Sequence, residues 1–214
     1  MSRLSIKICG LRTQEMVNAA LRHGATHIGL MHFAKSPRHL SVEQVNSLAA
    51  VIPPHVGRVA VLVDPDDTLV AALADGGKVS ALQLHGKETP ERVAEIAARS
   101  GLEIWKVISV KHAEDILAAS SYVGAAQRIL FDAKTPDGAA LPGGMGVRFD
   151  WSLLAGYRGA LPWALSGGLD PDNVRAAIAQ TNAPLVDVSS GVESAPGVKD
   201  VDKIAAFCKA VNAS

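Results

Sequence analysis

Eight short apolar runs alternate with longer stretches of helical periodicity from one end of the 214-residue chain to the other. The apolar runs predict strands at residues 4–8, 26–30, 57–63, 79–83, 103–108, 128–132, 161–165 and 184–188. Helices are predicted at residues 13–22, 41–50, 66–74, 89–99, 112–119, 150–155, 171–179 and 200–211. A strand followed by a helix, eight times over, is typical of parallel βαβ units in the α/β class.

Eight such units either close into a ring or spread into an open, doubly wound sheet. At about 27 residues per unit (214/8), the length suits a lean closed barrel, and no linker-like segment divides the chain. We therefore expect residues 1–214 to form a single domain, a (β/α)8 TIM barrel. Parallel α/β folds place their sites at the carboxyl ends of the strands, so candidate functional residues are those that end the predicted strands.

Cys9 ends the first predicted strand, and Asp132 ends the sixth. A thiol at the mouth of a barrel acts as a base or nucleophile when its pKa is lowered, and a carboxyl group at a strand end serves as a general acid. These two strands lie roughly opposite each other in an eight-strand ring, so a small substrate fits between them. The alternatives are apolar packing for Cys9 and loop anchoring for Asp132. Cys208, in a predicted helix, is expected to pack in the core.

Loops rich in glycine and serine follow the last three predicted strands, at residues 143–144, 166–168 and 189–191. Such loops bind phosphate through backbone N–H groups and a helix N-terminus, which requires no net positive charge. One Gly-Gly or Ser-Gly pair alone is ordinary turn chemistry. Three of them on successive strands predict a phosphate site.

Other polar residues lie near the ends of the second and fourth predicted strands. Arg38 follows Pro37, and an arginine held by a turn suits a bidentate contact with a carboxylate, although a solvated loop arginine fits the spacing equally. Gln83 and His85 alternate at the end of the fourth strand, so both face the mouth and suit a sugar hydroxyl or an aromatic ring. A hydrogen-bonded core histidine is the competing interpretation of His85.

The sequence lacks the usual signatures of metal and nucleotide sites. Its seven histidines fall in different units without paired carboxylates at ligand spacing, and neither CxxC nor HExxH occurs. The glycine-rich segments match neither GxGxxG nor GxxxxGK[ST]. We therefore expect no metal site, and nicotinamide and P-loop nucleotide chemistry are disfavoured. The long connection at residues 133–149 is predicted to be a lid, because loops of this length are usually functional.

Charge and cysteine content indicate the surroundings of the protein. Lys and Arg number 21 and Asp and Glu number 21, so the formal net charge is zero, which disfavours nucleic acid and anionic membranes as partners. No segment approaches the roughly 18 apolar residues of a membrane-spanning helix. Two cysteines form no disulfide framework, and the first residues show no signal-like apolar stretch, so we expect a cytoplasmic protein.

Eight segments, taken together, resemble the phosphoribosylanthranilate isomerases of tryptophan biosynthesis. They are KICG (7–10), SPR (36–38), LQLHG (82–86), LFDA (130–133), PGGMGVRFDW (142–151), LSGGLDPDNV (165–174), DVSSGVE (187–193) and KD (199–200). They occur in order over nearly the whole chain. The resemblance implies a (β/α)8 barrel that acts on a small phosphorylated substrate without a cofactor, as a monomer or homodimer.

The resemblance also implies a reaction. N-(5-phosphoribosyl)anthranilate, an aminoaldose, becomes 1-(2-carboxyphenylamino)-1-deoxyribulose 5-phosphate, an aminoketose, by an Amadori rearrangement. The motifs assign the general base to Cys9 and the general acid to Asp132. An acid and a base that work at one pH need surroundings that favour opposite protonation states.

The same motifs imply the binding residues. Arg38 would hold the anthranilate carboxylate, Gln83 and His85 would line the pocket, and Asp187 would orient the substrate. The phosphate would be held by Gly144, Gly168, Ser189, Ser190 and Gly191.

The chain departs from the family pattern at two positions. Met145 replaces a usual threonine, and Arg12 replaces a small polar residue. The glycines beside Met145 are kept, so phosphate binding through the backbone is expected to survive.

Three other functions stay open. A metal-dependent pentose phosphate epimerase needs a set of His and Asp metal ligands. A related synthase needs Lys and Glu at strand ends. A non-catalytic barrel that only binds a phosphorylated ligand needs no thiol at its mouth. Cys9 and Asp132 favour the isomerase.

Overall fold

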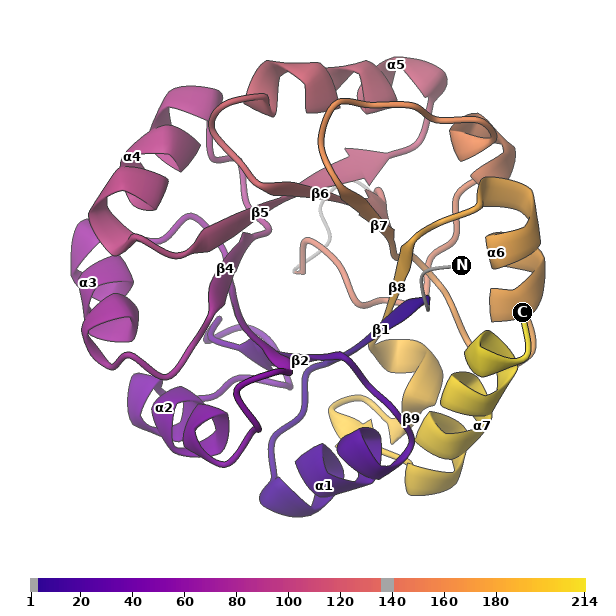
Figure 1. Ribbon diagram of the computed structural model, residues 1–214, viewed down its shortest axis with the longest axis horizontal. Helices are drawn as coiled ribbons and strands as arrows, with labels where there is room; N and C mark the ends of the chain where they lie inside the picture. Colours follow the sequence, from indigo (N-terminus) through magenta and orange to yellow (C-terminus); the bar gives the residue numbers. More distant parts are fainter. Residues whose placement is uncertain (1–3, 136–140) are drawn as a thin grey trace.

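The structure is a computed structural model that describes residues 4–135 and 141–214. Eight parallel strands form a closed barrel in chain order, and the eighth pairs with the first (Figure 1). They are β1 (Ser5–Cys9), β2 (His27–Met31), β3 (Gly57–Leu62), β4 (Ala81–Leu84), β5 (Glu103–Val110), β6 (Arg128–Ala133), β7 (Trp163–Leu165) and β8 (Leu185–Val188). Every predicted strand is present, which confirms the predicted (β/α)8 barrel.

Helices surround the ring of strands on the outside (Figure 1). They are α1 (Gln14–Arg22), α2 (Val42–Ala50), α3 (Asp67–Asp75), α4 (Pro90–Ser100), α5 (Ala113–Leu117), α6 (Val174–Thr181) and α7 (Val201–Asn212). Five of them begin after a residue whose side chain accepts a hydrogen bond from a backbone N–H in the first turn, which fixes where the helix starts. These N-caps are Thr13, Ser41, Asp66, Thr89 and Asp200.

Two connections differ from the prediction. The helix predicted at 150–155 is a short 3-10 turn, η2 (Trp151–Leu154), and Gly156 follows it at a positive φ of 74°. A small hairpin, β9 (Glu193–Ala195) and β10 (Val198–Lys199), follows the turn η3 (Ser190–Val192) between β8 and α7. Its strands of three and two residues are too short for an apolar alternation to show in the sequence.

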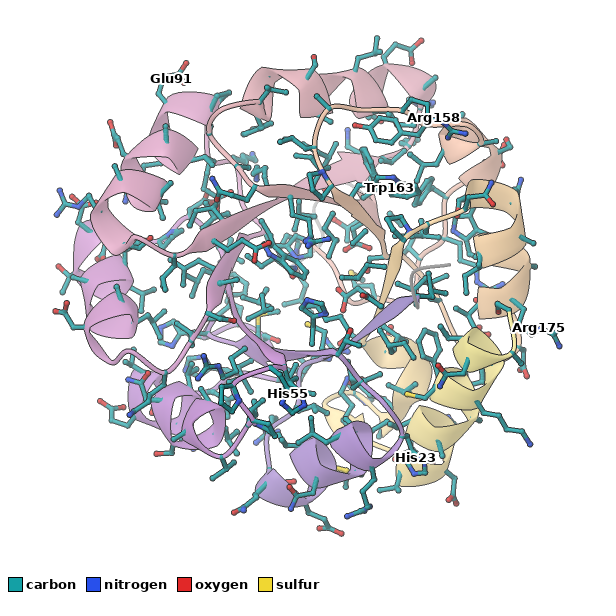
Figure 2. All side chains as sticks on the ribbon, in the orientation of Figure 1. His23, His55, Glu91, Arg158, Trp163 and Arg175 are labelled. Carbon is teal, nitrogen blue, oxygen red and sulfur yellow. The ribbon has the colours of Figure 1, made fainter. Side chains whose placement is uncertain are left out.

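The buried apolar residues form two layers. The larger layer fills the space between the strands and the helices. Figure 2 shows side chains on both sides of the strand ring, inside the barrel and between the ring and the helices. The smaller layer lies inside the barrel and consists of Val59, Ala81, Trp105, Val107, Leu130, Ala164 and Leu185. Because side chains alternate along a strand, the next inward-facing residues toward the carboxyl ends form the floor of the barrel mouth.

The connection predicted to be a lid includes residues 136–140, which lie outside the described residues. Its described remainder, 141–149, contacts the mouth: Arg38 donates to the Gly144 carbonyl, and Arg148 donates to the Gly168 carbonyl. Whether it opens and closes stays a prediction. Within the two described ranges, no helix is long and apolar enough to cross a membrane.

Candidate active site

A pocket with about 750 Å³ of empty volume opens at the carboxyl ends of the barrel strands. Ten of the eleven residues predicted for the site line it. They are Cys9, Arg38, Gln83, His85, Asp132, Gly144, Gly168, Asp187, Ser189 and Ser190. Gly191, the remaining one, packs against the backbone of the preceding loop, where an added Cβ would lie 1.9 Å from the Leu169 carbonyl oxygen. The barrel therefore brings residues from both ends of the sequence to one cavity.

Cys9 ends β1 and pairs in register with Gly29 on β2. The glycine is required there, because a Cβ on it would lie 2.7 Å from the Cys9 Sγ. Cys9 is only 5% exposed. Burial raises the pKa of its thiol above the ordinary value, although the neighbouring Lys7 lowers it. The lowered pKa that favours a thiolate is therefore not present in the protein without substrate, because the cost of burying a thiolate exceeds the attraction of the lysine.

Lys7 and Asp187 form a buried ion pair below the thiol. They are register partners on β1 and β8, and the Lys7 Nζ lies 2.9 Å from the Asp187 Oδ1. Burial alone lowers the pKa of Lys7, but Asp187 and Cys9 more than offset this and hold it above its ordinary value. The ammonium group therefore stays charged inside the barrel.

Asp132 is the penultimate residue of β6 and is 5% exposed. Its Oδ1 accepts a hydrogen bond from the Ala133 N–H at 2.9 Å, and its Oδ2 lies 3.3 Å from the Nε2 of His85. Gly143 approaches from the loop after β6, and a Cβ there would lie 2.6 Å from that Oδ2. The predicted alternative, loop anchoring, accounts for one carboxylate oxygen and leaves the other at the pocket.

Gln83 and His85 both line the pocket, as predicted. The Oε1 of Gln83 is buried without a hydrogen-bond partner among the described residues, and the Nε2 of His85 has only the Asp132 Oδ2 beside it, at 3.3 Å and without hydrogen-bond geometry. Unpaired buried polar atoms are costly, so the Gln83 oxygen marks where a polar ligand would bind.

Arg38 is held by an acidic side chain that the sequence did not single out. Its Nε and Nη2 donate to the two carboxylate oxygens of Glu193 at 2.7 and 2.8 Å. The Nη2 also donates to the Gly144 carbonyl at 3.1 Å. The bidentate contact predicted for a substrate carboxylate is thus made with Glu193, and within residues 4–135 and 141–214 no hydrogen bond engages the Arg38 Nη1. Arg38 is 4% exposed, so it is not a solvated loop arginine.

The predicted phosphate loops meet on one side of the pocket. Gly144 and Gly168 have positive φ angles of 71° and 65°, which favour glycine. The Ser189 hydroxyl donates a hydrogen bond to the Cys9 carbonyl at 3.2 Å. The Lys199 Nζ donates a hydrogen bond to the Ser189 carbonyl at 2.9 Å. Met145 also lines the pocket and is 49% exposed.

The described residues contain no cluster of three or more His, Cys, Asp or Glu side chains placed to hold a metal ion. The acid and thiol groups at the mouth therefore stand as separate candidates for proton transfer.

The sequence matches the family model for N-(5'phosphoribosyl)anthranilate (PRA) isomerase over residues 6–210. The chain belongs to this family. It is 52% identical over 207 residues to the N-(5'-phosphoribosyl)anthranilate isomerase of Zymomonas mobilis subsp. mobilis, covering 96% of each chain.

Solved structures of this isomerase family have the same fold. Monomers of the dimeric phosphoribosylanthranilate isomerase from Thermotoga maritima superpose with a TM-score of 0.84 at 35% identity, over 99% of this chain and 100% of that one. A phosphoribosylanthranilate isomerase in complex with reduced 1-(o-carboxyphenylamino)-1-deoxyribulose 5-phosphate superposes with a TM-score of 0.85 at 34% identity, with the same coverage.

Among the buried charged residues of this phosphoribosylanthranilate isomerase family member that the sequence interpretation did not name, three contact residues lining the pocket: Lys7, Glu193 and Lys199. Lys7 carried a usable signal, since it lies two residues before Cys9 on a predicted strand and so shares its inward face. Glu193 ends the segment DVSSGVE (187–193), but its pairing with Arg38 carried no signal, because the two residues are 155 apart in sequence.

Proposed function

We propose that the chain catalyses the isomerisation of N-(5-phosphoribosyl)anthranilate to 1-(2-carboxyphenylamino)-1-deoxyribulose 5-phosphate in tryptophan biosynthesis. Family membership supports the reaction. One observation supports the assignment of roles: Cys9 and Asp132, from opposite sides of the barrel, line one pocket together with the loops that follow β6, β7 and β8.

Asp132 acts as the general acid in this proposal. It protonates the ring oxygen of the ribose, and the ring opens to an iminium ion at C1. Its Oδ2 faces the pocket beside His85, while the Ala133 N–H holds its Oδ1. One oxygen is thereby fixed by the backbone and the other stays available for proton transfer.

Cys9 acts as the general base. Its thiolate removes the proton from C2 of the iminium ion; the electron pair of that C–H bond forms a C1=C2 double bond, and the π pair of the C1=N bond moves onto the nitrogen, giving an enolamine. The enolamine then takes a proton at C1 and loses the proton of its 2-hydroxyl group, which gives the ketone. The protonated imine serves as the electron sink, so the step needs no further group.

The remaining site residues bind the substrate. Arg38 offers its Nη1 to the anthranilate carboxylate, Gln83 offers its unpaired Oε1 to the sugar, and His85 lines the sugar side of the pocket next to Asp132. Asp187 orients the substrate through its fixed position on β8. The phosphate binds at Gly144, Gly168, Ser189, Ser190 and Gly191.

The proposal extends to organisation and location. We propose that residues 1–214 are one domain that works as a monomer or homodimer, since the Thermotoga maritima relative is described as dimeric. The two buried, unpaired cysteines support a cytoplasmic location.

The test is substitution of the two proton-transfer groups. Cys9→Ser and Asp132→Asn should fold normally by circular dichroism and lose turnover by roughly 10²- to 10⁴-fold. The assay follows the fluorescence change of freshly prepared substrate above its spontaneous decay. Cys208→Ser is the matched thiol control and should keep its turnover. Near wild-type turnover in both site variants would contradict the proposed roles, and no wild-type turnover above background would favour a binding protein.

A further inference from the structure

Lys7 is a fully buried charged residue inside the barrel. It is 0% exposed and pairs in register with Asp187, and the inner apolar cluster begins one inward-facing position lower on β8, at Leu185. A buried ion pair gains little over an apolar pair of similar volume, so its presence calls for an explanation other than stability. The position supplies one, because Lys7 lies directly below Cys9 on the inward face of β1.

We propose that Lys7 is a positioning residue that stabilises the thiolate of Cys9, and that Asp187 limits this effect by sharing the lysine charge. The inference rests on the proposed role of Cys9 as the general base. Lys7 reaches Asp187 at 2.9 Å and lies two residues before Cys9 on β1, so both side chains face the inside of the barrel. A cation beside a cysteine favours the charged form of the thiol, whereas a carboxylate opposes it.

The charges that face Cys9 come from several strands. Lys7 lies on β1, Asp187 on β8 and Lys199 on β10, and Lys7 influences the thiol more strongly than either of the others. The mouth adds Arg38, His85 and Asp132 as further groups lining the pocket.

Of these groups, Lys7 has the geometry to act on the thiol while remaining out of reach of the substrate. It does not line the pocket, whereas Asp187 does. A Cβ on the neighbouring Gly29 would lie 2.7 Å from the sulfur, which shows how closely β2 confines the thiol on its other side. The sulfur is therefore held between the lysine below it and the pocket above it.

The experiment compares two variants that differ only at residue 7: Asp187→Asn, and the double variant Lys7→Met with Asp187→Asn. Both variants lack the Asp187 carboxylate. The loss of Lys7 in the double variant therefore does not leave a buried carboxylate without a partner. The measurement is the rate of alkylation by iodoacetamide between pH 6 and 9, with Cys9 followed by mass spectrometry. Cys208 is the internal control, because burial raises its pKa to about 11 and it should stay unmodified.

We expect Cys9 in Asp187→Asn to be alkylated faster than in the wild type at neutral pH. The reason is that the Lys7 charge then stabilises the thiolate without being shared with the Asp187 carboxylate. The double variant should react about tenfold slower than Asp187→Asn, with its pH profile moved upward. A difference below about threefold, or a faster double variant, overturns the inference, because a contacting cation exerts a larger effect than that. If the double variant does not fold, the single variant decides: a rate equal to or below that of the wild type overturns the inference.

These outcomes are separate from the fate of the proposed function. Alkylation reports on the thiol whether or not it catalyses anything. If Cys9→Ser kept its turnover, the assignment of Cys9 as the general base would be contradicted, but the alkylation result would still report the effect of Lys7 on the thiol. If the two variants were alkylated at the same rate, only the role of Lys7 would be contradicted.

Discussion

Gly143 is the position at which one added methyl group tests the geometry of the proposed acid. A Cβ there would lie 2.6 Å from the Asp132 Oδ2 and 2.7 Å from the Cε1 of His85. Ordinary van der Waals contact begins at 3.4 Å, so in Gly143→Ala the carboxylate or the loop must move by 3.4 − 2.6 = 0.8 Å. The φ angle of Gly143 is outside the left-handed region, so alanine fits its backbone.

We expect Gly143→Ala to lower kcat by about 30- to 100-fold, because misplacement of a catalytic group by about 1 Å costs about 10²-fold in rate. KM should change little, since the phosphate loops after β7 and β8 are untouched. Steady-state turnover of N-(5-phosphoribosyl)anthranilate measures both constants, and circular dichroism checks the fold.

Gly146→Ala is the control in the same loop. Its Cβ would have room, with the Ser190 Oγ nearest at 3.8 Å, but its φ of 71° strains any residue with a side chain. This variant should raise KM through the phosphate side of the pocket more than it lowers kcat. Wild-type kcat in Gly143→Ala, or a loss no greater than that of Gly146→Ala, would refute the close approach as a constraint on Asp132.

Three further predictions concern stability. Burial, with nearby positive charges, lowers the pKa of His27 from 6.5 to about 4. As the pH falls, the unfolded chain therefore protonates His27 at a higher pH than the folded protein does, which favours unfolding. Between pH 7.5 and 5, the free energy of unfolding should drop by about 2 kcal/mol more in the wild type than in His27→Gln. Urea titration at each pH measures this difference. Glu193→Gln leaves Arg38 and Lys199 without their shared carboxylate and should cost about 3 kcal/mol at pH 7. Burial raises the pKa of Glu193, but these two cations outweigh burial and hold that pKa below 4.5. The contribution of Glu193 to the free energy of unfolding is therefore lost only as the pH falls below that value. If Glu193→Gln cost as much stability at pH 3 as at pH 7, this account would be contradicted. Cys208→Ala, in the core at 1% exposure, should cost about 1 kcal/mol in thermal unfolding and leave kcat unchanged; a lowered kcat would show that this thiol matters to the site.

The sequence predicts the strands well because each of them is a short apolar run between polar segments. β1 and β8 are examples, since four of the five residues of β1 and all four residues of β8 are buried. The helix predicted at residues 150–155 is wrong. The periodicity of these residues does not show that Asp150 turns the chain by accepting a hydrogen bond from the Ser152 N–H. Local hydrogen bonds of this kind compete with helix formation, and periodicity does not report them.

The candidate site was predicted in outline because strand-end residues are recognisable one at a time. Cys9 and Asp132 each follow an apolar run, and the fold brings them to one pocket. The partnership of Arg38 with Glu193 depends on a hairpin too short to predict, so the sequence placed the arginine but not the direction of its guanidinium group. The thiol of Cys9 shows the same limit, since its pKa depends on burial and on neighbours from other strands.

The ion pair between Lys7 and Asp187 also bears on how the chain matures during synthesis. Its members are 180 residues apart, on the two strands whose pairing closes the ring. Until the eighth strand has left the ribosome, the first strand is the open edge of an incomplete sheet and a template for pairing with another chain. An inward-facing charge on an edge strand discourages such pairing. The same lysine that lies beneath the thiol in the finished barrel would thus protect the nascent chain from aggregation.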